Sequence, residues 1–247
     1  MQEPDHDVVI IGGGVSGCAI ARELSRLKAR VLVVEREDDV CCGTSKANSA
    51  IVHAGYDAQT GSHMARLNVE GSRHMPGLCE ELGVHFMPIG SLVVCTSEEM
   101  LPGLEDLRQR GIANGGEGLE VIGRDRLLEL EPNVSDAAIG ALWAPTAGIV
   151  NPFQLTVALA EAANVNGVEF RFDTCVTGVS RDQDGLWHVS TTTGDVTSRV
   201  VVNAAGVHAD DLHNLVSDGH LTITPRRGQY YVLDTTAGAH VRHTVFA

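Results

Sequence analysis

The sequence predicts an α/β fold: a domain with a parallel βαβ unit and a small antiparallel meander, interleaved with an α+β domain. Three observations predict this class. An apolar, β-branched run at 8–11 leads into closely spaced glycines. A helix-like segment at 18–27 separates this run from a second apolar run at 31–34, which is the order of a parallel βαβ unit. Short segments between residues 176 and 199 are typical of antiparallel strands joined by tight turns.

The first two strands carry a nucleotide-binding pattern. Gly12 permits a tight strand-to-helix turn, Gly14 lets the backbone approach a pyrophosphate, and Gly17 lets the helix pack closely on the strand. The helix N-terminus offers N–H groups and a positive dipole end to phosphates. Glu35 lies eighteen residues after Gly17, where a carboxylate accepts hydrogen bonds from a ribose 2′-hydroxyl. The pattern predicts a dinucleotide site, with a purely structural βαβ turn as the alternative.

The middle of the chain alternates between helix and strand patterns. Apolar residues at helical spacing predict a helix over 62–82, and an apolar run predicts a strand over 90–95. Residues 97–100 have a capping-type pattern that predicts a helix start. A short strand and a short helix are expected over 119–130, ending before Pro132.

The later elements follow from proline and turn positions. Pro152 suits the first position of a helix that runs to about residue 165. Strands are expected at 168–172, 176–180, 187–191 and 196–199, of which the last three form the meander. We also expect a buried strand over 199–203 that runs into a small-residue turn, and a strand pair over 222–234 interrupted at 225–228.

The composition excludes several classes of partner. The 247 residues carry a formal net charge of −14 and a pI near 5.1, which argues against nucleic acid as a partner. An anionic substrate would therefore need its own local cations. The six cysteines form no C-x-x-C pair and no zinc-like spacing, so we expect no metal site and reduced, intracellular thiols. The apolar run 8–21 is too short and too rich in glycine to span a bilayer.

The glycine pattern alone does not distinguish NAD from FAD, but the chain provides for only one dinucleotide. Further blocks identify a family. They are DVVIIGGGVSG at 7–17, GTSKANSAIVHAGYDAQTGS at 43–62, ELGVHFMPIGSLVV at 81–94, APTAGIVNPF at 144–153, VVNAAGVHAD at 201–210 and TPRRGQYYVLD at 224–234. Together they resemble the D-amino-acid-oxidase-like flavoproteins, in the branch of FAD-dependent glycerol-3-phosphate dehydrogenases and oxidases and L-2-hydroxyglutarate oxidases.

The resemblance implies that FAD is the cofactor. The glycines and the acid would hold the ADP half of FAD, and the loop at 44–48 would pass the pyrophosphate. Val176 would lie near the adenine, with plain strand core as the alternative, and the turn 204–206 would allow close backbone approach, with tight layer packing as the alternative. The implied cofactor-binding residues are Gly12, Gly14, Gly17, Glu35, Thr44, Ser45, Asn48, Val176, Ala204, Ala205 and Gly206.

Two residues are candidates for the chemistry. An alcohol carbon gives up hydride readily only when its hydroxyl proton is removed, and imidazole suits that work near neutral pH. The resemblance places His53, in the N-S-x-x-H-x-G-Y block, beside the flavin, whereas a satisfied core histidine is the alternative. It places Arg227 beside the substrate, where a guanidinium fork suits a phosphate or carboxylate, although an arginine next to a turn is otherwise simply solvated. Tyr56 and Tyr230 are weaker candidates for substrate contact.

The resemblance implies oxidation of a small anionic 2-hydroxy substrate, with glycerol 3-phosphate ahead of L-2-hydroxyglutarate. His53 would take the hydroxyl proton and hydride would pass to flavin N5. It also implies four segments: 1–80 and 149–216 in the FAD-binding domain, and 81–148 and 217–247 in the substrate domain. Family members continue beyond residue 247, so the substrate domain is expected to be incomplete at its C-terminus. A non-catalytic flavin-binding subunit is therefore the alternative to an enzyme.

Other properties stay open at this level. A partner subunit could supply the remaining half, and the electron acceptor is oxygen, a quinone or an iron–sulfur partner. We expect a cytoplasmic protein, with peripheral attachment at the inner face of the membrane as the alternative. Two positions depart from the family pattern: residues 61–65 read GSHMA where GSLKA is common, and Asn151 replaces an aspartate. Each departure removes one charge and puts the anion specificity in question.

Overall fold

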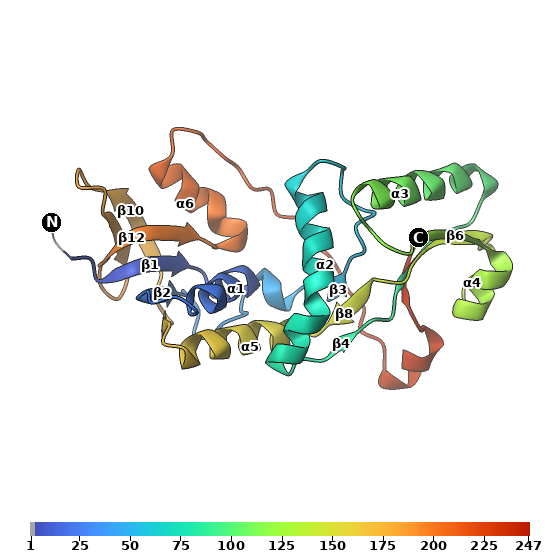
Figure 1. The fold of residues 1–247 in the computed structure, drawn as a ribbon, viewed down its shortest axis with the longest axis horizontal. Helices are drawn as coiled ribbons and strands as arrows, with labels where there is room; N and C mark the ends of the chain where they lie inside the picture. Colours follow the sequence, from blue (N-terminus) through green and yellow to red (C-terminus); the bar gives the residue numbers. More distant parts are fainter. Residues whose placement is uncertain (1–2) are drawn as a thin grey trace. The chain divides into compact units, whose positions relative to one another are not determined.

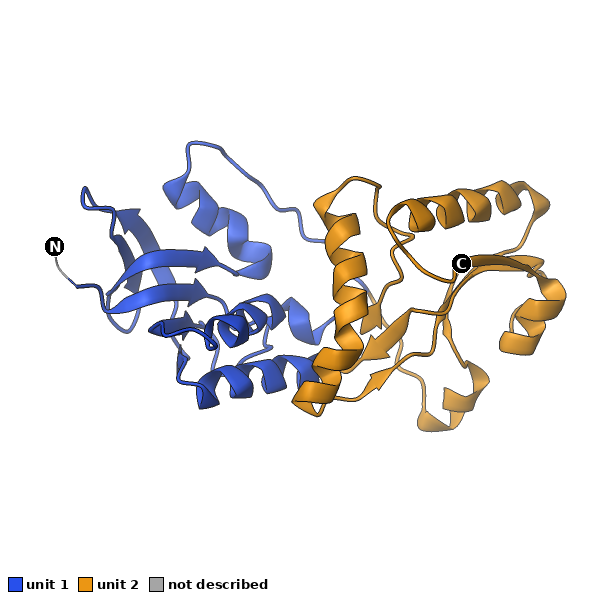
Figure 2. Cartoon of the chain, in the orientation of Figure 1, with its two compact units in different colours: residues 1–49, 152–228 blue, residues 50–151, 229–247 orange. Residues whose placement is uncertain are grey.

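The computed structural model describes residues 3–247, which divide into two compact units (Figure 2). Unit 1 comprises the described residues up to 49 and residues 152–228, and unit 2 comprises residues 50–151 and 229–247. The chain therefore leaves unit 1 once, returns, and then re-enters unit 2. This interleaved α/β architecture confirms the predicted fold class.

Unit 1 is built on a six-stranded sheet with the order β10-β11-β12-β1-β2-β9. Strands β12, β1, β2 and β9 run parallel, and β10, β11 and β12 form the antiparallel meander. The strands are β1 His6–Ile11, β2 Val31–Val34, β9 Glu169–Arg171, β10 Val176–Arg181, β11 Trp187–Thr191 and β12 Val196–Asn203. The helices are α1 Val15–Leu24, α5 Pro152–Val165 and α6 Ala209–Val216, with 3-10 turns η1 Thr44–Lys46 and η3 Gly206–His208.

Both faces of the parallel sheet are covered, as its uninterrupted apolar strands require. On one face, Ile10 and Val33 pack with Ala21 of α1 and Ala163 of α5, which lie side by side (Figure 1). On the other face, Val9 and Leu32 pack in a cluster that includes residues of the meander and of α6. Because side chains alternate along β1, its residues pack into two separate cores, one on each face of the sheet.

Unit 2 contains a four-stranded sheet, β13-β5-β7-β6, and a three-stranded sheet, β3-β8-β4. The strands are β3 Ile51–Val52, β4 Phe86–Met87, β5 Ser91–Cys95, β6 Glu120–Gly123, β7 Gly140–Ala144, β8 Gly148–Val150 and β13 Thr244–Phe246. The helices are α2 His63–Leu82, α3 Leu101–Ala113 and α4 Arg124–Leu130, with 3-10 turns η2 Glu98–Met100 and η4 Thr235–His240. In the larger sheet β13 pairs in parallel with β5, whereas the other pairs are antiparallel.

Helix α2 illustrates how local signals set an element's bounds. The Ser62 hydroxyl accepts a hydrogen bond from the Ala65 N–H at 3.1 Å and so caps the first turn. Gly83 ends the helix in the left-handed conformation at φ +66°, where a side chain would be strained. The helix has 20 residues, yet none of the helices in residues 3–247 combines the length and apolar character that a membrane crossing requires.

The four-stranded sheet of unit 2 is packed on both faces around β7. Leu142 is fully buried and packs with Leu104 of α3, whereas Ala141 packs with Leu127 of α4 on the opposite face. Leu142→Ala is expected to lower the free energy of unfolding by about 2–5 kcal/mol, because it leaves a cavity in a packed core. Urea denaturation followed by circular dichroism measures this change. Leu67→Ala, on the exposed face of α2, is the matched control, and an equal loss in the two variants would contradict the assigned core.

The unit boundary differs from the one predicted at residue 80. Residues 50–80 lie in unit 2, because β3 pairs with β8 and α2 contacts β4. The pairing partners of β3 lie about 100 residues further along the chain, at residues 148 and 149, and no local signal marks that distance. The second crossing, between residues 151 and 152, lies close to the predicted position. The third, between residues 228 and 229, differs from the predicted position after residue 216, so residues 217–228 belong to unit 1.

The structure corrects one expected strand and one expected strand pair. Residues 199–203 continue β12 instead of starting a new buried strand, and Val200 is 48% exposed. The strand pair expected over 222–234 is wrong, since residues 221–234 form neither helix nor strand and are exposed. A strand needs a neighbouring strand for its backbone hydrogen bonds, and no strand of the described residues pairs with this segment. The Leu221 and Ile223 N–H groups donate instead to the side chains of Asn214 and Asp210.

Candidate functional site

The turn between β1 and α1 depends on two glycines for steric reasons. Gly12 has φ +111°, and a Cβ there would lie 2.5 Å from the Ala204 carbonyl oxygen. A Cβ on Gly17 would lie 1.9 Å from the Gly12 carbonyl oxygen. Only glycine therefore fits either position. The tight turn assigned to Gly12 and the close helix packing assigned to Gly17 are both present.

The loop 44–48 lies against the N-terminus of α1. The Ser45 hydroxyl accepts a hydrogen bond from the Val15 N–H at 2.9 Å, and a Cβ on Gly14 would lie 3.1 Å from that hydroxyl. The Asn48 amide donates to the Ser45 carbonyl at 2.8 Å and holds the loop's shape, while Thr44 begins η1 and is exposed. Ser45 thus supplies the cap that Gly14, as N-cap residue, cannot provide from its own side chain.

Glu35 follows β2 and turns back over the glycine turn. Its Oε2 accepts the Gly13 N–H at 2.6 Å and its Oε1 accepts the Glu37 N–H at 3.0 Å. A carboxylate oxygen has more than one lone pair, so Glu35 can still accept a ribose hydroxyl. Glu35 therefore stabilises the glycine turn through its hydrogen bond with the Gly13 N–H, a role that its spacing in the sequence did not indicate.

The small-residue turn 204–206 lies beside the glycine turn. Strand β12 pairs with β1 in register Ile11 to Asn203, and the Ala204 N–H donates to the Ile11 carbonyl at 2.9 Å. Ala205 follows Ala204, and Gly206 has φ +58°. Two segments about 190 residues apart in sequence thus meet at the carboxyl edge of one parallel sheet, which is where open α/β sheets bind their ligands.

Val176 lies at the start of β10, opposite Thr191, and is half-buried. It packs against the core cluster that contains Val9 and Ile11. The strand-core role that we kept as an alternative is therefore present, and its predicted nearness to an adenine stays a prediction.

The carboxyl edge of unit 1 fits a bound dinucleotide. Helix α1 has no acidic residue in its first turn to repel a pyrophosphate, and its N-terminus lies at the glycine turn, with Gly14 as the N-cap residue. Glu35 stands at the end of β2 beside this turn, as a ribose contact requires. The residues that the structure brings together here are Gly12, Gly14, Gly17, Glu35, Ser45, Ala204 and the loop residues Thr44 and Asn48.

His53 lies in unit 2, directly after β3, and is half-buried. Its Nδ1 is buried without a hydrogen-bond partner among the described residues. Its ring stacks on Phe246 of β13, with centroids 5.9 Å apart and an angle of 26° between the planes. His53 is therefore not a core histidine with its hydrogen bonds satisfied, since the buried Nδ1 has no polar partner within the described residues.

Arg227 is exposed in the irregular stretch 221–234, and Tyr230 lies close to it in the chain, also exposed. Tyr56, by contrast, is buried, and its hydroxyl lies 3.2 Å from the Ser91 hydroxyl. Burial raises the pKa of Tyr56, which keeps the phenol neutral. Tyr56 is thus a core residue of unit 2, whereas the role of Arg227 stays a prediction.

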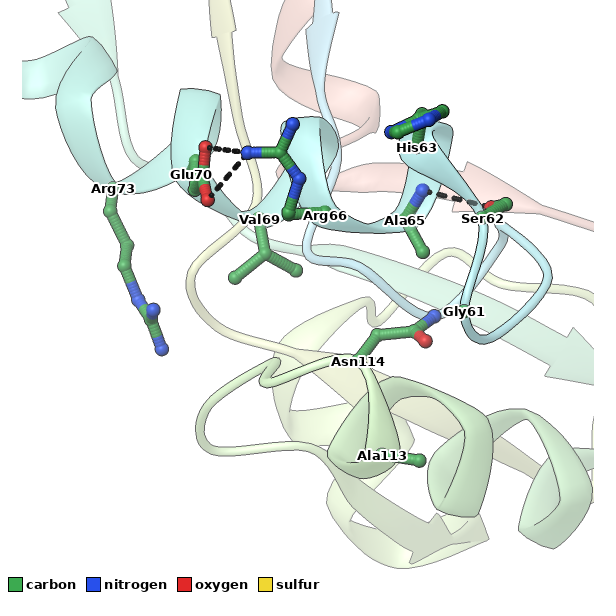
Figure 3. Close-up of a pocket in the computed structure, with 10 residues that line it drawn as sticks. All are labelled: Gly61, Ser62, His63, Ala65, Arg66, Val69, Glu70, Arg73, Ala113 and Asn114. Atoms are coloured by element: carbon green, nitrogen blue, oxygen red, sulfur yellow. Dashed lines mark hydrogen bonds and ion pairs between the residues drawn. The ribbon is translucent and has the colours of Figure 1, made fainter.

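Unit 2 also contains a cleft of about 460 Å³ along the first turns of α2 (Figure 3). Ser62, His63, Arg66, Arg73 and Asn114 are among the residues that line it. Arg66 pairs with Glu70 at 3.2 Å, and Arg73 pairs with Glu117 at 2.8 Å. Both arginines are therefore paired with carboxylates of unit 2, and the residues that line the cleft include none of the predicted site residues.

The cysteine nearest the glycine turn is expected to be inert. The Cys18 thiol donates to the Gly13 carbonyl at 3.4 Å, and burial, with smaller effects of Cys41 and Glu35, raises its pKa to about 12. Since the thiolate is the nucleophile, iodoacetamide at pH 8 should modify exposed Cys175 first and leave Cys18 intact until unit 1 unfolds. Mass spectrometry of tryptic peptides over time tests this order. Equal rates for both cysteines in the folded chain would contradict the burial.

Two residues connected with β13 escaped the sequence analysis. Phe246 contacts the imidazole, and Glu131 is a buried carboxylate that binds the segment before β13. Glu131 precedes a proline at the end of a short helix, a position that sequence patterns normally assign to solvent. Its burial arises from contacts with residues more than 100 positions away, which no local pattern reports.

Comparison with known proteins gives consistent results. Residues 7–246 match the family described as "DAO: FAD dependent oxidoreductase". The chain is 43% identical over 240 residues to a glycerol 3-phosphate dehydrogenase of Caloramator mitchellensis, covering 97% of this chain and 50% of that protein. It is 29% identical over 244 residues to an L-2-hydroxyglutarate dehydrogenase of Escherichia coli strain K12, covering 98% of this chain and 57% of that protein.

Among solved structures, the fold resembles that of a dithionite-reduced L-α-glycerophosphate oxidase from Mycoplasma pneumoniae with FAD bound. The TM-score is 0.87 at 31% identity, covering 98% of this chain and 64% of that chain. The chain thus spans between 50% and 64% of the length of these three relatives.

Proposed function

Since the chain belongs to the DAO family of FAD-dependent oxidoreductases, we propose that it oxidises a small anionic 2-hydroxy substrate, foremost glycerol 3-phosphate to dihydroxyacetone phosphate. FAD is the cofactor. Support for the substrate comes from the relatives named glycerol 3-phosphate dehydrogenase and oxidase. The single observation that carries the proposed chemistry is His53, a half-buried imidazole whose Nδ1 is buried without a partner among residues 3–247.

FAD would be held by unit 1. The glycine turn and the N-terminus of α1 suit its pyrophosphate, and Glu35 suits a ribose hydroxyl. When bound, FAD supplies an acceptor for the hydride of the alcohol carbon.

His53 is proposed as the general base. A neutral imidazole accepts the hydroxyl proton of the substrate and so raises the electron density at the carbon that loses hydride. Phe246 covers one face of the ring, which limits the directions from which water and substrate approach it. A base in this setting contributes about 10²–10⁴-fold to the rate.

Arg227 is proposed to bind the substrate anion. Its exposed position leaves the guanidinium available, and a planar fork suits both phosphate and carboxylate. If this is so, Arg227→Lys raises KM more than it lowers kcat. L-2-hydroxyglutarate is the alternative substrate, favoured by the relatives named for it. We further propose a cytoplasmic location.

The test is an anaerobic visible spectrum of the chain after mixing with FAD and removing the excess. Retained flavin absorbance that bleaches with glycerol 3-phosphate but not with L-2-hydroxyglutarate supports the proposal. Bleaching only with L-2-hydroxyglutarate moves the assignment to the alternative substrate. Retained flavin that neither substrate bleaches would overturn the enzymatic role of the chain by itself and favour a flavin-binding subunit.

A further inference from the structure

We propose that Glu131 is a positioning residue for His53. The buried Glu131 carboxylate holds β13 against β5, and β13 in turn holds the Phe246 ring against the imidazole. The consequence for turnover rests on the proposed function of His53, whereas the mechanical link rests on contacts within unit 2 alone.

Glu131 is a charged residue that is only 2% exposed. Its Oε1 accepts hydrogen bonds from the Arg242 N–H at 2.7 Å, from the His243 N–H at 2.5 Å and from the His243 Nδ1 at 2.9 Å. Hydrogen bonds to a buried ionised group are stronger than neutral ones, and a buried donor left without its acceptor is destabilising. Glu131 therefore fixes the two residues that directly precede β13.

Further contacts hold the residues between η4 and β13 in place. The Trp143 ring meets the His243 ring edge-on, with centroids 5.1 Å apart. The Asn133 amide donates to the His240 carbonyl at 2.9 Å, and the Thr244 N–H donates to the Gly90 carbonyl at 3.3 Å. The segment that precedes η4 is exposed and irregular, so the stretch from His240 to Thr244 is the anchor of β13 on its N-terminal side.

Strand β13 connects this anchor to the imidazole. It pairs with β5 through Thr244 opposite Ser91 and Phe246 opposite Val93. Phe246 presents its ring to His53, whose Nδ1 has no hydrogen-bond partner among the described residues to fix its orientation. The ring contact therefore sets the orientation of His53, and the contact persists only while β13 is docked.

The test compares Glu131→Gln with Glu129→Gln. Glu129 lies in α4, is exposed and pairs with Arg126, so its variant is the matched control. We expect amide hydrogens of residues 242–246 to exchange at least about tenfold faster in Glu131→Gln, because the charge-assisted hydrogen bonds are weakened. We also expect the ring signal of His53, in chain labelled with ¹³C-histidine and assigned with His53→Gln, to move as it does in Phe246→Leu.

A double variant separates positioning from general destabilisation. If Glu131 acts on His53 through Phe246, adding Glu131→Gln to Phe246→Leu moves the His53 signal no further. A merely structural role would lower the unfolding midpoint without moving this signal in the folded chain. If Glu131→Gln does not fold, His243→Ala replaces it, because alanine removes the side-chain donor and leaves the two backbone donors.

The outcomes distinguish this link from the proposed function. Unchanged exchange at 242–246 would overturn the role of Glu131 in docking β13, and faster exchange with an unmoved His53 signal would overturn the link to His53. If the signal moves and kcat falls by about tenfold or more, with KM less affected, the whole inference stands. If the signal moves while His53→Gln retains full turnover, the link stands and the proposed base is wrong.

Discussion

Gly17→Ala is expected to abolish retention of FAD and to destabilise unit 1. A Cβ at this position would lie 1.9 Å from the Gly12 carbonyl oxygen, and the clashing atom is backbone within the cofactor turn. A flexible side chain could move aside, but this turn is held by the pairing of β1 with β2 and β12. Overpacking costs about 1–3 kcal/mol or more, and any relief must shift the N–H groups that would face the pyrophosphate.

The measurement is flavin absorbance after gel filtration, together with the thermal unfolding midpoint. Gly71→Ala is the control, because Gly71 lies inside α2 and a Cβ there meets nothing within 4 Å. Alanine at that helix position should stabilise by about 0.5–1 kcal/mol and leave flavin retention unchanged. A Gly17→Ala chain that retains a full complement of flavin at an unchanged midpoint would show that the turn tolerates a side chain.

His53→Gln is expected to lower kcat with glycerol 3-phosphate by about 10²–10⁴-fold while FAD retention stays unchanged. Glutamine keeps a polar side chain of similar reach but does not accept a proton near neutral pH. Since Nδ1 of His53 makes no hydrogen bond with the described residues, the substitution breaks none at that atom and should not unfold unit 2.

Anaerobic stopped-flow bleaching of the flavin checks this prediction. His85→Gln is the control, since His85 is an exposed histidine of the same unit. Equal bleaching rates for the parent chain and His53→Gln, with every substrate tested, would rule out His53 as the base. A parallel loss in His85→Gln would instead point to a general effect on the folded chain.

The βαβ unit was predictable because its determinants are local. Gly12 is required by its own positive φ, and Gly17 is required by the Gly12 carbonyl oxygen five residues earlier, so the spacing of the glycines identifies the turn. The meander was predictable for a similar reason, since its strands alternate and its turns carry glycine at 185 and 194 with φ above 80°. The family resemblance added the loop at 44–48 and the turn at 204–206, which spacing could not connect to the glycines.

The errors arose where the outcome depends on a distant partner. Residues 50–80 join unit 2 because β3 pairs with β8, and the expected strand pair at 222–234 is not formed because its residues have no strand to pair with in the described chain. Exposed Tyr231 and Val232, at 94% and 95%, show that apolar, β-forming residues alone do not produce a strand.

The sequence by itself determined the βαβ class and the glycine turn after the first strand, and with the family resemblance it led to the prediction that His53 takes part in the chemistry. These conclusions follow from steric requirements between residues close in sequence and from the sequence blocks that carry the family resemblance. Only the tertiary structure decided that Glu35 braces Gly13, that Ser45 caps α1 and that the carboxylate of Glu131 is buried. Such contacts join residues 22 to 112 positions apart. They form only when the whole chain is packed, so no local segment of the sequence indicates them.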